Sequence, residues 1–363
     1  MSPDHDVIVG VSGGVDSAVA LKLVQDSGCR VSALFMKNWE EDDDGEYCAA
    51  AQDLEDARRV CAHLGVELKT VNLAAEYWDR VFTGFLESYR DGKTPNPDVL
   101  CNREIKFRSF MEFAGDYGAD IMATGHYARL RLDGGRHRLL KGADPDKDQS
   151  YFLCLLDQSQ LARAVFPLGE LYKTSVRHLA RRHALHNHAR RDSTGICFIG
   201  ERPFRQFLSR YLPPDPGSIE SDAGRCLGQH EGLMYYTIGQ RQGLGIGGEP
   251  GGSGQPWYVA SKDFDTNTLV VVQGRDHPLL FAGALTAIDA HWIAGEPPAM
   301  PLRCRAKIRY RQPDQPCSVE SGADGRLLVR FDTPQWAVTP GQMVVFYQDE
   351  ECLGGASILG PGG

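Results

Sequence analysis

The sequence has no long apolar segment. No run of about 18 or more apolar residues occurs in the 363-residue chain, so we expect no membrane-spanning helix. The N-terminus lacks the basic stretch and apolar core of a secretory signal peptide, and we therefore expect a cytoplasmic protein. None of the ten cysteines forms a Cys-x-x-Cys pair, which argues against a zinc knuckle or a thioredoxin-like site, and no protein-held metal is expected.

Positive charge is in the minority. The chain has 39 Lys and Arg residues against 48 Asp and Glu, a formal net charge of −9, which argues against broad affinity for nucleic acid. The charge is uneven, however, because residues 40–46 are acidic and residues 173–191 are strongly basic. Besides four histidines, the basic segment contains Arg177, Arg181, Arg182, Arg190 and Arg191. It suits contact with a phosphate backbone, and a merely solvated helix face is an equally good interpretation.

Two common phosphate-binding motifs are missing from the turn after the first predicted strand, Val7 to Val11. This turn has neither a P-loop lysine nor the Gly-x-Gly-x-x-Gly pattern. It reads Ser-Gly-Gly-Val-Asp-Ser over residues 12–17, and an apolar helical segment from Ala18 to Val24 follows, with Gly28 as its C-cap candidate. Ligands bind at this edge of an α/β sheet, where glycines permit close approach and helix amides attract phosphate.

The Ser-Gly-Gly-x-Asp-Ser pattern resembles the PP-loop of ATP pyrophosphatases. The resemblance implies binding of the pyrophosphate of ATP, activation of a substrate oxygen by attack at the α-phosphate, and release of pyrophosphate. The alternative is an ordinary Gly-rich turn, but the match lies at the correct end of the first strand. Mg²⁺ should accompany ATP, because the pyrophosphate charge needs neutralising.

Strand and helix patterns alternate through the first part of the chain. The predicted strands are residues 31–36, 66–73 and 120–124, and the predicted helices are residues 51–64, 76–89 and 102–117. This alternation predicts a doubly wound parallel sheet. Met36 ends a strand on the edge that carries the PP-loop, where an adenine would lie, although periodicity alone favours a core methionine.

A polar loop precedes the helix predicted at 102–117. Two prolines bracket Asn96 and predict a rigid, extended segment before that helix. Cys101 would then lie at a helix N-terminus, where the dipole favours the thiolate. Asp98 is close enough in sequence to exchange a proton with a group bound there. A buried, inert cysteine is the alternative.

A second loop cysteine, Cys197, lies between Gly195 and Gly200. The strand at 120–124 should bring His126 to the PP-loop edge of the sheet. Two loop thiols beside an ATP site indicate sulfur chemistry. ATP would adenylate a carbonyl oxygen, a persulfide on one cysteine would deliver sulfur, and the other cysteine would close a disulfide.

The composition changes after the prolines at 203–216. Residues 217–274 are rich in glycine, with predicted strands at 257–260 and 268–273 and a flexible loop or plain linker at 237–248. Short strands and frequent turns predict a small β-barrel at 277–363. We therefore predict three domains, with limits at 1–202, 203–276 and 277–363.

One predicted strand of the last domain carries a row of cations. Its alternate positions are Arg303, Arg305, Lys307, Arg309 and Arg311. A period of two would point all five from one face of a sheet, where they would suit a phosphate backbone. A charged, solvated strand face is the alternative.

Seven motifs, in order along the chain, resemble those of tRNA-specific 2-thiouridylases of the MnmA type. They are residues 12–17, 94–98 with Cys101 and Asn102, 123–127, 147–151, 192–200, 239–244 and 309–312. The resemblance implies that ATP adenylates the C2 oxygen of the wobble uridine of a tRNA, and that a persulfide then supplies sulfur. It also implies a persulfide donor, either a cysteine desulfurase or a sulfur-relay protein.

The same resemblance implies roles for single residues. Cys197 would carry the persulfide, and Cys101 would be the nucleophile or resolving thiol, with a transient disulfide between them. The residues implied to hold ATP are Gly10, Val11, Ser12, Gly13, Gly14, Val15, Asp16, Ser17, Met36 and Gly125. Those implied to contact tRNA are Asn96, Pro97 and Asp98 at the target base, and His126, Lys147, Asp148, Gln149, Arg309, Tyr310 and Gln342 elsewhere.

Two other functions stay open at the level of sequence. A PP-loop ligase that amidates a small carboxylate or nucleotide would need neither cysteine, and no glutaminase domain is visible to supply nitrogen. A non-catalytic RNA-binding protein with a relic nucleotide site would keep its full function after mutation of Asp16.

Overall fold

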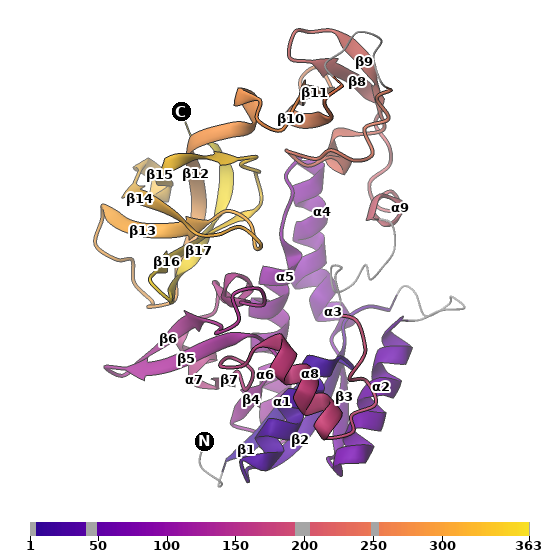
Figure 1. Ribbon diagram of the computed structural model, residues 1–363, viewed down its shortest axis with the longest axis vertical. Helices are drawn as coiled ribbons and strands as arrows, with labels where there is room; N and C mark the ends of the chain where they lie inside the picture. The colour runs from indigo at the N-terminus through magenta and orange to yellow at the C-terminus, as the bar shows by residue number, and fades with distance from the viewer. Residues whose placement is uncertain (1–4, 41–48, 193–203, 248–253, 363) are drawn as a thin grey trace.

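The computed structural model describes residues 5–40, 49–192, 204–247 and 254–362. Figure 1 shows a parallel-sheet domain from the first half of the chain, with a small β-sheet unit and a β-barrel beside one another at its other end. The predicted fold class is therefore confirmed. No helix in the described part of the chain is long and apolar enough to cross a membrane.

A five-stranded parallel sheet forms the centre of the first domain. The strands, in spatial order, are β3 (Leu68–Asn72), β2 (Arg30–Lys37), β1 (Asp6–Val11), β4 (Ile121–Ala123) and β7 (Ala164–Val165). Side chains alternate across β1: Val7 and Val9 pack into one apolar cluster, and Ile8 packs into another. Both faces of the sheet are thus buried, as the apolar sequence of β1 predicts.

Helices cover the two faces. One cluster contains residues of α1 (Val15–Asp26), α2 (Ala49–Leu64) and α8 (Lys173–Arg182). The other contains residues of the helical segments between β3 and β4. Those segments are α3 (Ala74–Tyr77), η1 (Trp78–Phe82), α4 (Thr83–Arg90), α5 (Pro97–Leu100), η2 (Cys101–Ser109) and α6 (Phe110–Asp116). The remaining segments of this domain are η3 (Ser150–Leu153) and α7 (Gln158–Ala162).

The helix expected to start at Asn102 starts earlier. Its first residue is Pro97, and Asn96 is the extended N-cap residue. Proline suits this position because its fixed φ fits a helix and its missing N–H is not needed there. Cys101 therefore lies beyond the first turn, within a run of helix that continues through η2. The expectation that its thiol lies at a helix N-terminus is wrong, because the dipole effect fades within the first turn.

A hairpin from the first domain joins the barrel. It consists of β5 (Ala128–Asp133) and β6 (Arg136–Lys141), and its two-residue turn is formed by Gly134 and Gly135, both with positive φ. Strand β6 continues the sheet of the barrel, because Leu139 and Leu140 pair with the last strand at Cys352 and Glu351, and β5 lies at the outer edge.

The central unit is a four-stranded sheet. Its elements are α9 (Phe204–Leu208), β8 (Gly217–Ser221), β9 (Cys226–His230), η4 (Leu233–Tyr235), β10 (Trp257–Asp263) and β11 (Thr268–Gln273). The strand order is β10-β11-β8-β9. The two strands predicted at 257–260 and 268–273 are confirmed, and the first extends to Asp263.

The C-terminal strands close into a six-stranded barrel. Its elements are η5 (Pro278–Leu280), β12 (Phe281–Trp292), β13 (Leu302–Lys307), β14 (Gln315–Ser321), η6 (Ala323–Gly325), β15 (Leu327–Trp336), β16 (Met343–Gln348) and β17 (Glu351–Pro361). The order is β12-β15-β14-β13-β16-β17, and pairing of β12 with β17 closes the ring. Closure leaves the barrel without a free edge.

The predicted row of five cations is wrong. Strand β13 ends at Lys307, so the alternation stops before Arg309 and Arg311. Within the strand, the cations pair with carboxylates. The pairs are Arg303 with Asp332, Arg305 with Asp314, and Lys307 with Asp148. Carboxylates therefore neutralise these three cations, and Lys307 is itself buried together with its partner.

Gly341 is a tight contact between the barrel and the first domain. Its φ is +87°, and an added Cβ would lie 2.9 Å from the Lys93 Cβ and 3.0 Å from the Thr94 backbone nitrogen. We expect Gly341→Ala to lower stability by about 1–3 kcal/mol beyond the cost of its backbone strain. Chemical denaturation followed by far-UV circular dichroism measures this difference.

Gly295 is the matched control, since its φ is +86° and nothing lies within 4 Å of its added Cβ. Gly295→Ala thus carries the same strain without the contact. Equal losses for the two variants would contradict the importance of the contact at Gly341.

Candidate active site

The PP-loop lies where the strand order of the parallel sheet reverses. Strand β1 has β2 on one side and β4 on the other, so the loops after β1 and β4 face each other at the carboxyl edge. Gly125, just after β4, lies directly against the PP-loop: an added Cβ would be 2.9 Å from the carbonyl carbon of Asp16 and from the Ser17 nitrogen. Only glycine fits this approach. The structure thus brings together two segments that the sequence assigned to the ATP site.

The loop itself is held by Ser17. Its Oγ accepts a hydrogen bond from the Ser12 backbone N–H at 3.1 Å and donates to the Gly14 carbonyl at 3.1 Å. Helix α1 then starts from the extended Gly14, and no side chain in the described structure caps it. The helix start therefore offers backbone amides and a positive dipole end to an anion.

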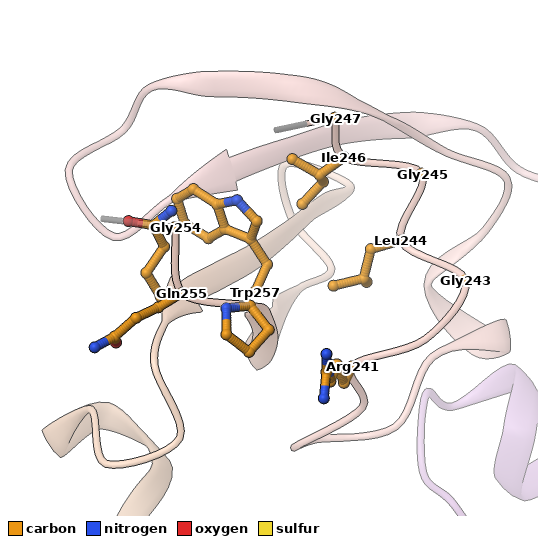
Figure 2. Close-up of a pocket in the computed structure, with 11 residues that line it drawn as sticks. Arg241, Gly243, Leu244, Gly245, Ile246, Gly247, Gly254, Gln255 and Trp257 are labelled. Atoms are coloured by element: carbon orange, nitrogen blue, oxygen red, sulfur yellow. The ribbon is translucent and has the colours of Figure 1, made fainter. Parts of the chain in front are cut away.

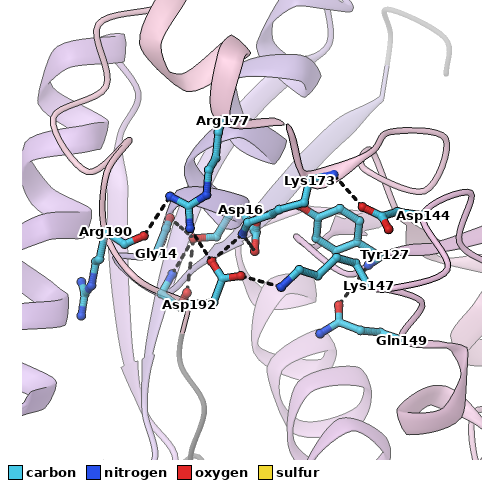
Figure 3. A network of polar contacts seen from close by, with 12 residues as sticks. Gly14, Asp16, Tyr127, Asp144, Lys147, Gln149, Lys173, Arg177, Arg190 and Asp192 are labelled. Carbon is cyan, nitrogen blue, oxygen red and sulfur yellow. Dashed lines mark hydrogen bonds and ion pairs between the residues drawn. The ribbon is translucent and has the colours of Figure 1, made fainter. Parts of the chain in front are cut away.

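Asp16 is the centre of the polar network in Figure 3. The Lys173 Nζ lies 2.7 Å from both carboxylate oxygens, and the Tyr127 hydroxyl donates to Oδ1 at 2.7 Å. Lys173 is only 8% exposed. Burial, followed by the negative charge of Asp16, raises the pKa of Tyr127, so this hydroxyl stays a donor. Asp16 thus joins α1, α8 and the segment after β4.

Asp192 binds cations from three places. Its carboxylate lies 2.6 Å from the Lys147 Nζ, 2.8 Å from the Lys173 Nζ and 2.8 Å from the Arg177 guanidinium (Figure 3). Burial opposes ionisation of Asp192, but the hydrogen bonds from Lys147 and Lys173 outweigh burial and lower its pKa to about 2. The four charged groups form one compact patch beside the PP-loop.

Arg190 closes the other side of the loop. Its guanidinium pairs with Asp53 and Asp56 of α2 and donates to the Gly13 carbonyl at 3.3 Å. The Asn187 side chain donates to the same carbonyl at 2.8 Å. Gly13 has a φ of +74°, and its added Cβ would lie 2.5 Å from the Asp53 carbonyl oxygen. Two residues of the basic segment, Arg177 and Arg190, thus bind the protein itself.

The segment expected to face the target base leads into α5. Asn96 is its N-cap residue, Pro97 is buried and Asp98 lies in its first turn. Cys101 follows and is 1% exposed, so its thiol is covered in this conformation. Cys197 falls outside the described residues. The roles of these two cysteines stay predictions.

Four residues expected to contact tRNA lie beside this network. His126 accepts from or donates to the Thr124 hydroxyl at 2.8 Å, and burial, together with the nearby Lys106 charge, lowers its pKa. Asp148 is 5% exposed and accepts hydrogen bonds from the Gly142 and Ser150 amides. Gln149 accepts from the Tyr127 amide and Lys147 binds Asp192. These side chains hold the segments at residues 124–127 and 147–150 in place. Their contacts with tRNA stay predictions.

Three further residues expected to contact tRNA lie at domain junctions. The Arg309 guanidinium donates to the carbonyls of Ile238 and Ala337 at 3.0 and 3.1 Å. Tyr310 packs on Phe152, with ring centroids 4.4 Å apart. Gln342 donates to the Thr94 carbonyl at 2.7 Å. Met36, expected near adenine, is partly buried near the end of β2.

The central unit contains a separate cavity of about 370 Å³. Figure 2 shows the indole of Trp257 on one side and Arg241, Leu244 and Ile246 on the other. It is not the PP-loop site, and none of the residues expected to hold ATP lines it. In the described part of the chain, no three His, Cys, Asp or Glu side chains gather as they would around a metal.

The family model described as the tRNA methyl transferase HUP domain matches residues 5–201. The tRNA methyl transferase PRC-barrel domain matches 205–273, and the aminomethyltransferase β-barrel domain matches 282–358.

Curated relatives named tRNA-specific 2-thiouridylase MnmA match almost the full length. The protein of Methylococcus capsulatus is 61% identical over 97% of this chain and 95% of its own. That of Sodalis glossinidius is 60% identical over 97% and 96%, and that of Yersinia pestis is 58% identical over 97% and 95%. This chain belongs to the MnmA family of tRNA-specific 2-thiouridylases. The expected resemblance is confirmed.

Sequence reasoning missed the partner of Asp16 in this MnmA-family site. Lys173 is 157 residues away in the chain, so no local pattern links the two. One signal was present: Lys173 is the first residue of α8, where the helix dipole disfavours a cation. A lysine at such a position points to a specific carboxylate partner.

The Asp192 contacts predict a dependence of stability on pH in this MnmA-family protein. A folded-state pKa of about 2 lies below the ordinary 3.8, so Asp192 stabilises the fold above 3.8 and loses this effect as pH falls towards 2. We expect the difference in melting temperature between wild type and Asp192→Asn to be largest between about pH 5 and 7 and to shrink below about pH 4.

The control is Asp26→Asn, which removes the carboxylate of the exposed Lys22–Asp26 pair. Exposed pairs contribute little, so its difference should be small at every pH. A constant difference for Asp192→Asn down to pH 3 would contradict the role given to its ionised form.

Proposed function

We propose that this protein is an ATP-dependent sulfurtransferase that converts the wobble uridine of a tRNA to 2-thiouridine. The observation that carries the proposal is the fit of Gly125 against the PP-loop, at the point where the sheet order reverses. Identity of about 60% with the named 2-thiouridylases over nearly the whole chain supports the substrate. In this proposal all three domains bind the substrate. The family matches at 5–201, 205–273 and 282–358 support domain limits near residues 202 and 276.

The first step forms a bond from the uridine C2 oxygen to the α-phosphorus of ATP. Pyrophosphate leaves with the bonding electron pair. Residues Gly10 to Ser17 would hold the phosphates through the amides at the start of α1, Lys173 and Lys147 would supply positive charge nearby, and Met36 and Gly125 would border the nucleotide. Mg²⁺ would neutralise the charge of ATP, and we assign it no side chain.

The second step replaces the activated oxygen by sulfur. The terminal sulfur of a Cys197 persulfide attacks C2, and AMP leaves with the oxygen. Cys101 then attacks the Cys197 sulfur, which forms a disulfide and releases 2-thiouridine with the transferred sulfur. A thiol reductant restores both cysteines. In this proposal Asp98 would accept or supply a proton, and Asn96 and Pro97 would face the base.

Cys101 must become accessible for this step. It is the first residue of η2, directly after α5, and it is almost fully buried in the described structure. Because π-helical turns occur frequently at functional sites, we place the local opening that exposes the thiol here.

Pyrophosphate release tests the first step. Purified protein, ATP, Mg²⁺ and a persulfide source should release pyrophosphate in a manner that depends on unmodified tRNA, and the recovered tRNA should contain 2-thiouridine by nucleoside mass spectrometry. Asp16→Asn should reduce both signals, because it removes the negative charge that binds Lys173 and one of the two oxygens that this lysine contacts.

Other outcomes would change the assignment. Release that ignores tRNA but responds to a small carboxylate or nucleotide would make the protein a ligase. The matched family model bears the words tRNA methyl transferase. Methylated nucleoside formed from a methyl donor, without pyrophosphate, would favour that reaction. Full cellular function of Asp16→Asn would favour a non-catalytic RNA-binding protein.

Substitution of each cysteine should block a different step of sulfur transfer. Cys197→Ser should abolish persulfide loading, whereas Cys101→Ser should accept labelled sulfur and still fail to make 2-thiouridine. Radiolabelled sulfur on protein and on tRNA, measured side by side, distinguishes the two variants.

Cys226→Ser is the control, because Cys226 is an exposed cysteine of the central unit. It should keep both loading and product. Normal product from Cys101→Ser would remove that residue from the mechanism, and protein-bound sulfur on Cys197→Ser would place the persulfide elsewhere.

A further inference from the structure

The segment between α4 and α5 is fixed by a residue of the central unit. Helix α4 ends in a Schellman motif, in which the Gly92 N–H donates to the Tyr89 carbonyl and the Lys93 N–H to the Ser88 carbonyl. The Gly92 carbonyl points out of this motif and accepts a hydrogen bond from the Lys262 Nζ at 2.9 Å. Lys262 belongs to β10, so this bond spans two domains.

Phe264 covers the same point. Gly92 has a φ of +72°, and an added Cβ would lie 1.7 Å from the Phe264 ring. The ring therefore packs directly on the backbone of Gly92. Strand β10 and the turn after it thus contact the end of α4 through one polar and one apolar side chain, and Figure 1 shows the central unit meeting the end of α4.

The barrel contacts Thr94, two residues further along the chain. The Thr94 N–H donates to the Pro340 carbonyl at 2.8 Å, and the Gln342 side chain donates to the Thr94 carbonyl at 2.7 Å. The Thr94 hydroxyl also lies 3.3 Å from that of Thr237 in the central unit. The central unit and the barrel therefore both contact residues 92–94, which precede Asn96 in the chain.

Lys262 is placed for a backbone contact. No carboxylate among the described residues lies within ion-pair distance of it. Burial lowers its pKa to about 8. An amine donates a hydrogen bond to a carbonyl in either protonation state, so the contact persists through neutral and mildly alkaline pH. Partial burial of a lysine is unfavourable when no carboxylate pairs with it. The hydrogen bond to the Gly92 carbonyl offsets this cost, so we take that bond to be the role of Lys262.

We propose that Lys262 is a positioning residue, which together with Phe264 sets the placement of Asn96–Cys101 against the target base from the central unit. The proposal rests on the proposed function and deepens it. Residues 92–94 lead directly into α5, so a shift of Gly92 would pass to Asn96 and Asp98. A misplacement of about 1 Å at a reacting group is enough to reduce a rate 100-fold.

Lys262→Met tests the proposal, because it keeps the apolar stem and removes the donor. At saturating ATP and tRNA, we expect the rate of 2-thiouridine formation to fall between about 10- and 100-fold, with the KM for tRNA unchanged. Lys262→Arg should restore much of the rate, since a guanidinium can still donate to the Gly92 carbonyl. The matched control is Lys69→Met, since Lys69 is also partly buried but lies on β3 near Tyr117.

A second measurement does not depend on the reaction. Alkylation of Cys101 by iodoacetamide, followed by peptide mass spectrometry, reports how well α5 and η2 stay closed. We expect faster labelling in Lys262→Met and in Phe264→Ala than in wild type, at temperatures where all variants are folded. The Lys69→Met control should label at the wild-type rate.

The outcomes separate the two claims. If wild type makes no 2-thiouridine, the proposed function fails, and the labelling rates still decide the positioning role. If wild type is active, equal product rates and equal labelling in Lys262→Met overturn that role. A raised KM for tRNA with an unchanged maximal rate would also overturn it, because Lys262 would then bind RNA directly.

Discussion

The carboxylate of Asp16 is the contact on which the site depends. It accepts hydrogen bonds from Tyr127 and Lys173, which lie 111 and 157 residues further along the chain. These bonds fix the start of α1, the segment after β4 and the start of α8 relative to one another. A charged hydrogen bond of this kind is stronger than a neutral one, and removing one partner leaves the other partly buried without compensation. The PP-loop is therefore shaped by residues far from it in sequence.

Local pattern was enough to predict the first domain's architecture. The apolar run of β1, the glycines around it and the alternation of strand and helix all agree on one parallel sheet, and the structure confirms this sheet. The ends of helices and strands were harder to predict where two local sequence signals favour different structures. The helix holding Cys101 begins at Pro97 because proline at the first position outweighs the extended preference of the loop before it. The cation row failed because strand β13 ends at Lys307, which period-two alternation alone cannot foresee.

The parts of the site that are adjacent in sequence could be predicted from the sequence. Residues 12–17 form one turn, so their proximity follows from the sequence. The approach of Gly125 follows from the rule that parallel strands present their carboxyl ends at one edge. Lys173, Asp192 and Arg190 are different, because their places depend on how α8 and the following segment pack on α1 and α2. Tertiary packing of this kind is reflected in the sequence only indirectly, for example by a lysine at the start of a helix, where the dipole disfavours a cation.

The hairpin β5–β6 has a consequence for synthesis of the chain. Its strand β6 pairs with β17, whose residues Glu351 and Cys352 lie more than 200 positions later. A ribosome makes about 5–20 residues per second, so this edge waits on the order of ten seconds or more for its partner. Unpaired strand edges are templates for association with other chains. Arg136 and Arg138 place charged side chains on β6, and charged side chains discourage pairing between an exposed strand edge and other chains.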